Sequence, residues 1–143
     1  MSATEPDDRG SFAIEAAILV PSLVLFLLLV IAAGRIETAK GAMDAAARDG
    51  ARSASLARTV DAAQTAAEDS AAATLHQEGV TCQDQQVADV DTDDFAPPLG
   101  QTGEVTVTVT CTVPLGDLSV PGLPGSHTMT SSFTSVIDAY RAR

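Results

Sequence analysis

Aromatic and basic residues are scarce in this chain of 143 residues. It has no Trp, one Tyr and four Phe, and its 19 Asp and Glu outnumber its 8 Lys and Arg, which gives a net charge of −11. Nucleic-acid binding needs a basic surface, so the composition argues against a DNA- or RNA-binding protein and against nucleic acid as a partner. The length suffices for one small domain with an appendage, not for two separate cores.

Charged residues are missing altogether from Ala16–Gly34. As a helix this stretch would span about 29 Å, close to the thickness of the hydrocarbon core of a bilayer. Its centre, residues 18–31, is apolar on every side, which is typical of a membrane span or of a helix buried in a large protein. The rest of the chain is too small and too rich in Ala and Val to bury it. The sequence therefore predicts a single-pass membrane protein in contact with lipid.

A cleavable secretory signal is the alternative interpretation of this apolar segment. The residues before it contain three acids and one basic residue, Arg9, whereas a secretory signal begins with a basic region. The small residues at Ile31–Ala33 nevertheless resemble a weak cleavage site. Release of a secreted domain after Ala33 therefore stays open as an alternative.

The two cysteines, Cys82 and Cys111, both lie far downstream of the apolar segment. They form no CxxC motif and no cluster of His or Cys accompanies them, which disfavours a zinc or redox site. We predict a disulfide, which would place the C-terminal region outside the cytoplasm; two free buried thiols are the alternative. The positive-inside rule favours the opposite orientation, because four basic residues follow the apolar segment and only Arg9 precedes it. We give the cysteines more weight.

Hydrophobic periodicity predicts a long helix from Phe12 to about Glu78. This region is rich in good helix formers and has a single proline, Pro21. Small residues recur at steps of three and four between Ile36 and Ala57, which predicts a stripe for close packing against another helix or a sheet. Gly79 stands where a glycine commonly ends a helix. Three glycines inside the stretch are candidate kink sites: Gly34, Gly41 and Gly50.

The region from Val80 onwards has the pattern of a small sheet. Residues 104–113 alternate between Val or Cys and Thr, which predicts a half-buried antiparallel strand. A weaker strand is predicted to begin at Thr81–Gln83, and residues 128–137 form a third. Pro- and Gly-rich loops cover residues 96–100 and 114–125. The predicted fold class is therefore α+β: a long N-terminal helix whose first half spans the membrane, followed by a small antiparallel sheet of about three strands.

Glu15 is the one acidic residue close to the start of the apolar segment. An ionised carboxylate inside lipid costs roughly 2.5–3.5 kcal/mol. It does not complete a capping box, because with Ser11 as N-cap the required position holds Ile14. A favourable position at the helix N-terminus or among lipid headgroups is one interpretation. The other is a buried positive partner, for which a newly freed backbone amine is the obvious candidate.

The residues around Glu15 resemble a known processing site. The string Arg9-Gly10-Ser11-Phe12-Ala13-Ile14-Glu15-Ala16-Ala17 resembles the class III prepilin peptidase site of the type IV pilin superfamily. With Pro21 and Gly34-Arg35 added, about 27 residues closely resemble the TadE-like minor pilins (pseudopilins) of tight-adherence (Tad/Flp) pilus systems. Downstream, the agreement is in layout only.

The resemblance implies a role for each matching residue. The peptidase would recognise Gly10 before the scissile bond, and Ser11 would become the first mature residue. Glu15 would neutralise the N-terminal amine of a neighbouring subunit, since two buried opposite charges in contact offset each other's penalty. Pro21 would remove the helix hydrogen bond to the Ala17 carbonyl and kink or loosen the helix, although an ordinary membrane-helix proline is an equal alternative.

The implied protein is a structural subunit of the cytoplasmic membrane, cleaved after Gly10 and assembled into, or at the tip of, a pilus for adhesion or secretion. Its partners would be other pilin subunits, met through the N-terminal helix, the prepilin peptidase, and the Tad membrane platform with its secretion ATPase. The implied layout is a leader (1–10), a transmembrane assembly helix (11–34), a helical extension (35–79) and an extracytoplasmic β-rich domain (80–143). The alternative is an uncleaved single-pass anchor whose ectodomain binds a ligand or partner.

No catalytic or metal-binding pattern stands out. The acidic run Asp89–Asp94 invites a calcium interpretation, but the EF-hand positions for Gly and Glu hold Asp94 and Gly100. We therefore expect a solvated loop, with no metal and no cofactor, and a calcium loop outside the EF-hand class is the alternative. His76 and His127 are isolated, and no serine lies in a nucleophile motif. We expect a protein that is not an enzyme.

Overall fold

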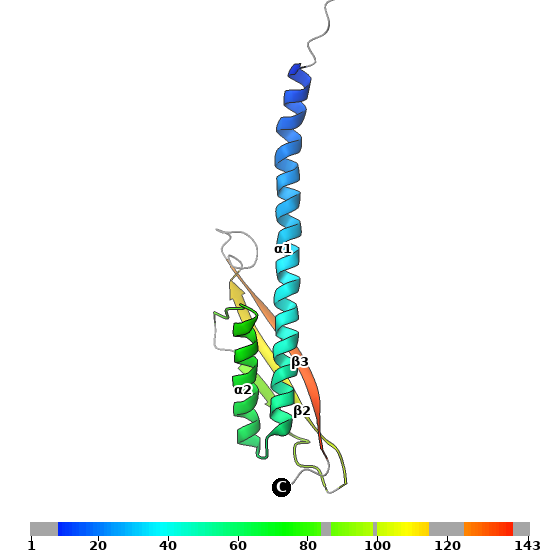
Figure 1. Cartoon of the computed structure of the whole chain (residues 1–143), viewed down its shortest axis with the longest axis vertical. Helices are drawn as coiled ribbons and strands as arrows, with labels where there is room; N and C mark the ends of the chain where they lie inside the picture. The colour runs from blue at the N-terminus through cyan, green and yellow to red at the C-terminus, as the bar shows by residue number, and fades with distance from the viewer. Residues whose placement is uncertain (1–8, 84–86, 99, 115–124, 139–143) are drawn as a thin grey trace, which may run out of the picture.

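The computed structural model describes residues 9–83, 87–98, 100–114 and 125–138. It contains two helices, α1 (Arg9–Leu56) and α2 (Val60–Gln77), and three strands, β1 (Val87–Asp91), β2 (Gly103–Pro114) and β3 (Ser126–Ile137). The second half of α1 packs against α2 and the sheet, whereas its first half projects alone (Figure 1). The predicted α+β fold, with a long apolar N-terminal helix and a small antiparallel sheet, is confirmed.

The expectation of one unbroken helix to about Glu78 is wrong. The chain turns at residues 57–59, and α2 runs back beside the packed half of α1 (Figure 1). Thr59 has an extended backbone (φ −129°, ψ 156°), and its hydroxyl accepts a hydrogen bond from the Ala62 N–H at 3.2 Å. Threonine is a preferred N-cap because this bond satisfies an otherwise unpaired donor of the first turn. The alanine-rich stripe of α1 therefore packs against a second helix of the same chain.

The end of α2 is where Gly79 predicts it. Gly79 has φ +71°, a conformation that favours glycine, and its N–H donates to the His76 carbonyl at 3.2 Å. The N–H of Val80 donates to the Leu75 carbonyl at 2.9 Å. These two bonds make a Schellman motif, which satisfies the last carbonyls of the helix. Val80 then packs against the core, and the chain turns towards the sheet.

The sheet has the order β1-β2-β3 with antiparallel neighbours, so β2 is central. Side chains of β2 alternate strictly between the buried helix side and the half-buried outer side, as the Val/Thr pattern predicts. α1 covers β2 and β3, and α2 packs against β1. The helices contribute mostly small residues to the core: Ala39, Ala42, Met43, Ala46, Ala47, Ala51, Ala54, Ala63, Ala67, Ala71 and Leu75.

Two of the three strand predictions are confirmed. Residues 104–113 lie within β2 and residues 128–137 within β3. The strand predicted to begin at Thr81–Gln83 is wrong, since these residues are not in a strand and β1 begins at Val87. The Gln83 N–H still donates to the Thr112 carbonyl at 2.8 Å. Among the described residues, this segment therefore touches β2 next to the disulfide without being part of a strand.

The outer face of the sheet is a surface of hydroxyl groups. Threonines on β2 and β3 face each other in register and share side-chain hydrogen bonds: Thr106–Thr134 at 2.8 Å, Thr110–Thr130 at 3.3 Å and Thr112–Thr128 at 3.1 Å. Such cross-strand pairs each stabilise a sheet by a few tenths of a kcal/mol to about 1 kcal/mol. They hold β3 to β2 on the side that no helix covers.

Candidate functional site

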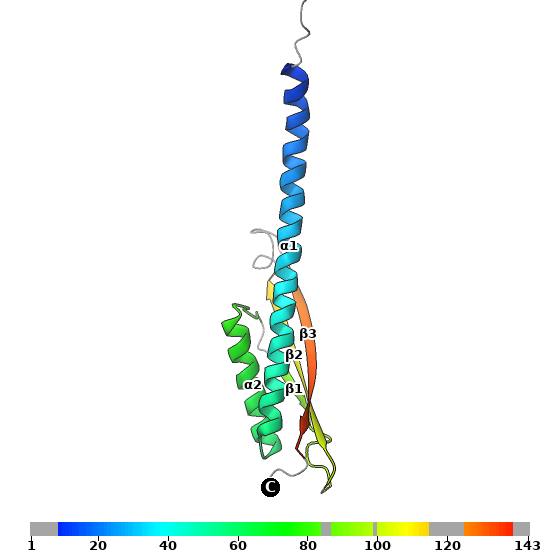
Figure 2. The same cartoon turned by 45° about the vertical axis from the view of Figure 1, so that its right-hand side comes forward.

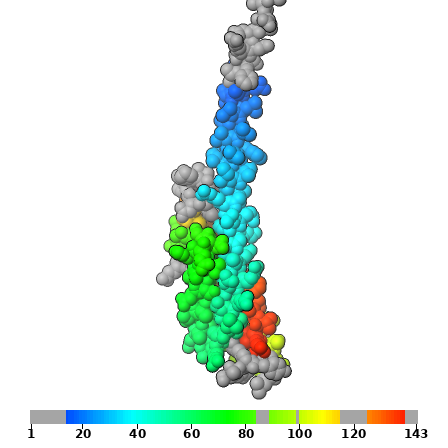
Figure 3. All heavy atoms as spheres, viewed as in Figure 1, coloured from blue at the N-terminus to red at the C-terminus, as the bar shows by residue number. Residues whose placement is uncertain are grey.

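The projecting half of α1 is the most unusual surface of the molecule. Every large apolar side chain from Ile14 to Ile36 is exposed within the chain, with Leu23 at 69%. Figure 3 shows this segment standing clear of the packed domain. In the described part of the chain, α1 is the one helix long and apolar enough to cross a membrane. A contiguous apolar surface of this size is unfavourable in water, and its length and composition are consistent with a single-pass membrane anchor.

This apolar half is continuous with the packed half. α1 runs without interruption through Gly34, Gly41 and Gly50, the three candidate kink sites. The first buried residue along it is Ala39, so residues 9–38 project about 45 Å, more than the roughly 30 Å of a bilayer core. The folded domain is therefore attached to the apolar segment by a helix and not by a linker. Cleavage after Ala33 would cut this helix between two helical residues.

Gly10, Ser11 and Glu15 lie at the start of α1. The backbone at Gly10 and Ser11 is helical. Glu15 follows one turn after Ser11 and is exposed, and no hydrogen bond or ion pair reaches it from the described residues. Ser11 and Glu15 are separated by about 6 Å along the axis. The carboxylate thus lies at the start of an apolar helix without a partner from the described part of its own chain.

Pro21 does not interrupt the helix. α1 continues through it, although Pro has no N–H to donate to the carbonyl of Ala17. In the same turn the Ser22 hydroxyl donates to the Ile18 carbonyl at 2.8 Å. Side-chain hydroxyls that bind the backbone in this way are common in membrane helices, where an unpaired polar group is costly.

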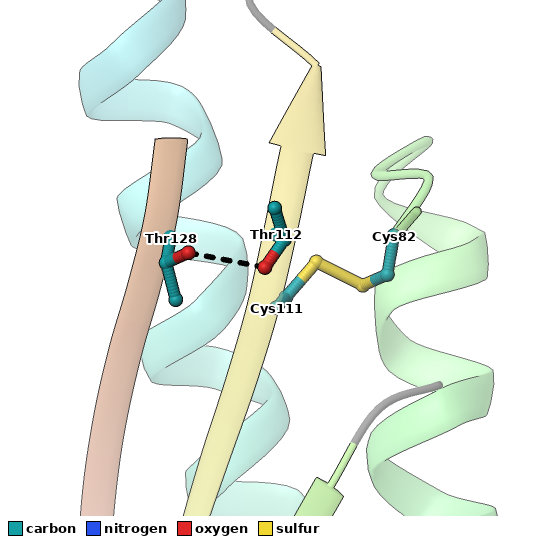
Figure 4. The surroundings of a disulfide bond; sticks show 4 residues. All are labelled: Cys82, Cys111, Thr112 and Thr128. Carbon is teal, nitrogen blue, oxygen red and sulfur yellow. Dashed lines mark hydrogen bonds between the residues drawn. A yellow bond between two sulfur atoms is a disulfide. The ribbon is translucent and has the colours of Figure 1, made fainter. Parts of the chain in front are cut away.

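The disulfide is present between Cys82 and Cys111, with Cα atoms 5.3 Å apart, and neither cysteine is free. It ties the segment that follows α2 to the central strand (Figure 4). Cys111 is buried on the helix side of β2, beside the outward-facing Thr112. The prediction of a disulfide is confirmed, and the alternative of two free thiols is wrong. Such a bond forms and persists in an oxidising compartment.

The other singled-out residues are not brought together. Asp89 and Asp91 lie on β1, and the Asp93 N–H donates to Asp91 Oδ1 at 3.1 Å. Within the described ranges, no three His, Cys, Asp or Glu side chains are grouped as metal ligands. His76 is exposed in the last turn of α2, and His127 is exposed on β3.

Sequence reasoning missed two contacts between α1 and β3. The Ser131 hydroxyl donates to Asp44 Oδ1 at 2.5 Å, and the guanidinium of Arg48 lies 5.4 Å from the ring centroid of Phe133. Spacing by four residues places Asp44 and Arg48 on one face of α1. The sequence shows this four-residue spacing, but it does not show that β3 packs beside this face of α1.

Comparison with known proteins supports the interpretation of the helix. The family model described as TadE-like protein matches residues 10–52, which cover α1 from its first turn almost to its end. The resemblance to TadE-like proteins is therefore confirmed over this segment. No curated protein and no solved structure matches the chain.

Proposed function

We propose that this chain is a TadE-like minor pilin of the type IV pilin superfamily, cleaved after Gly10 and assembled through the first half of α1. The observation that carries the proposal is the arrangement of this helix. An apolar surface exposed on all sides follows the Gly10-Ser11 and Glu15 motif and continues as a helix into a packed domain. Such a helix can leave a bilayer and enter a bundle of like helices while its domain stays attached and folded.

Glu15 provides the polar contact of this assembly. Cleavage after Gly10 leaves a free amine on Ser11, about 6 Å along the axis from Glu15 of the same chain. A neighbouring subunit displaced by about one helical turn brings its own amine level with this carboxylate. The two charges then offset each other's desolvation penalty in an apolar bundle, and the pair fixes the axial register.

The disulfide supports an extracytoplasmic ectodomain. A Cys82–Cys111 bond needs an oxidising compartment, whereas the basic residues that follow the apolar segment favour the opposite orientation. A structural bond that crosses the folded core is the stronger evidence. The proposed role is therefore packing and presentation at the outer side of the cytoplasmic membrane.

The first test is the intact mass and N-terminal sequence of the protein from native membranes, without reduction. We expect a chain that starts at Ser11, with a mass two hydrogens below the reduced value. A chain that still starts at Met1 or Ser2 would overturn leader removal and leave an uncleaved anchor with a binding ectodomain.

Two variants separate processing from assembly. Gly10→Leu should block leader removal, whereas the control Gly34→Leu, whose Cβ would meet open space, should be processed normally. Glu15→Leu should be cleaved but should no longer co-purify with partner pilins, and Glu37→Leu is its matched control outside the apolar segment. Normal co-purification of the Glu15 variant would contradict the proposed charge pair.

A further inference from the structure

Charge is unevenly distributed over the folded domain. All basic residues lie at or before Arg58, or at Arg141 and Arg143. α2 and its C-cap therefore carry no Lys or Arg, and their four acids, Asp61, Glu68, Asp69 and Glu78, are all exposed. Asp61, Glu68 and Asp69 lie opposite the buried alanines of α2. We call this side the α2 flank.

The opposite side is positively charged next to α1. Lys40, Asp44, Arg48 and Arg52 are all exposed and follow one another at four-residue spacing, so they share one face of α1. Two of them touch β3, through the Asp44–Ser131 hydrogen bond and the Arg48–Phe133 contact. We call this stripe, together with the free edge of β3, the β3 flank. It has three basic side chains and one acidic one.

The free edge of β3 is unusually open for association. β3 pairs with β2 without a break over twelve residues and contains neither Pro nor a charged Asp, Glu, Lys or Arg. Natural proteins usually protect an edge strand by shortness, charge or proline. The other edge strand, β1, has five residues and carries Asp89 and Asp91. Among the described residues, this protection is therefore present at the edge beside α2 and absent on the β3 flank.

The two flanks lie on opposite sides and at the same level. α2 packs against β1 at one edge, while α1 packs towards β3 at the other, and both views show α2 and β3 on either side of α1 (Figures 1 and 2). A Cβ on Gly50 would lie 3.3 Å from the Ala67 carbonyl oxygen. Arg48 and Arg52 are therefore level with Glu68 and Asp69.

We propose that the α2 flank of one copy docks against the β3 flank of a second copy, with Arg48 and Arg52 facing Glu68 and Asp69. Copies anchored in one membrane by their first helices stand side by side in the same orientation, which is the arrangement that brings these flanks together. The contact is head-to-tail, so each copy keeps one free flank and the association can repeat. Arg48 and Arg52 are one helical turn apart, so the contact tolerates a displacement of one turn. It depends on the anchoring in the proposed function, not on leader removal.

Cysteine crosslinking of the full chain in membranes tests this contact without removing any charge. Val136 is exposed on β3, and Thr65 is exposed on the acidic face of α2, one turn before Asp69. Copies that carry Val136→Cys and copies that carry Thr65→Cys, with different tags, are co-expressed and treated with a short bismaleimide. We expect a mixed crosslink, and little crosslinking when either variant is present alone. Thr108→Cys, at the centre of the outer sheet face, is the control partner and should give none.

Charge exchange provides the second measurement. Arg48→Glu with Arg52→Glu in the Val136→Cys copy should lower the mixed crosslink about fivefold or more, because attraction at two sites becomes repulsion. Glu68→Arg with Asp69→Arg in the Thr65→Cys copy should restore it. Absence of the mixed crosslink, or equal yield after charge reversal, would overturn the proposal. The N-terminus of the same sample reports on the proposed function separately, since a crosslinked chain that starts at Met1 supports the flank contact while contradicting leader removal.

Discussion

A Cβ added to Gly50 of α1 would lie 3.2 Å from Cγ1 of Val107 on β2. The same atom would lie 3.3 Å from the Ala67 carbonyl oxygen of α2. Gly50 therefore occupies the point where the two helices and the central strand meet. Its lack of a side chain allows this approach, although glycine in a helix interior costs about 0.5–1 kcal/mol relative to alanine. Gly41 lies in the same helix and faces open space.

These two glycines give a matched prediction. Gly50→Leu should lower the free energy of unfolding by about 1–3 kcal/mol, because the side chain overpacks a closed site. Gly41→Leu should raise it by about 0.5–1 kcal/mol, since leucine is a better helix former and meets no obstacle. Thermal unfolding of the full chain in detergent measures both, and we expect midpoints shifted in opposite directions. Equal shifts would contradict the three-way contact at Gly50.

The features that the sequence predicted well are set by neighbouring residues. The alternation of Val and Thr in β2 needs only the two-residue period of a strand with one covered face. The end of α2 needs only a glycine at Gly79, where the positive φ is costly for other residues. The apolar half of α1 likewise follows from length and composition alone. These patterns do not depend on how the elements pack.

The turn between α1 and α2 was missed because nothing local requires it. Ala57-Arg58-Thr59 contains neither Gly nor Pro, and good helix formers lie on both sides. The turn forms because α2 can then pack its alanines against those of α1 and the sheet, which an extended helix would leave exposed. The contacts of Asp44 and Arg48 with β3 depend on the same packing. The turn and these contacts both arise from tertiary packing, which at the turn outweighs the helix propensity of the neighbouring residues.

Thr59 supplies the local part of this turn and can be tested. Thr59→Ala removes the hydroxyl that accepts from the Ala62 N–H and should destabilise the protein by about 1 kcal/mol. Thr65 is the matched control, because it lies inside α2, is exposed, and donates only to the Asp61 carbonyl. Thr65→Ala should leave the unfolding midpoint unchanged or raise it slightly, since alanine has the higher helix propensity. A similar loss in both variants would contradict the capping role of Thr59.

Gly103 at the start of β2 is a second close approach. A Cβ here would lie 2.5 Å from the Asp94 carbonyl oxygen and 2.9 Å from Cδ of Pro97. Because a backbone oxygen cannot move aside as a flexible side chain can, Gly103→Ala should destabilise the domain by about 1–3 kcal/mol. Gly34→Ala, with open space around it, is the control and should not lower the unfolding midpoint. The comparison is again made by thermal unfolding of the full chain.

The disulfide should contribute a large share of the stability of this small domain. The two cysteines are 29 residues apart, and closing such a loop stabilises the folded state by about 3–4 kcal/mol when the effect is ascribed to chain entropy. A core built mostly of alanine buries little apolar area for each residue, so few other contacts can replace this contribution. The variant with both Cys82→Ala and Cys111→Ala should therefore unfold at a much lower denaturant concentration than the oxidised protein.

Reduction of the unaltered protein provides the control for this experiment. A reducing agent should shift its unfolding midpoint towards that of the double variant and should leave the double variant unchanged, because only the former has a bond to lose. If reduction shifted neither protein, the sheet and the helix pair would hold without the bond. Equal shifts in both proteins would instead point to an effect of the reagent that does not involve Cys82 and Cys111.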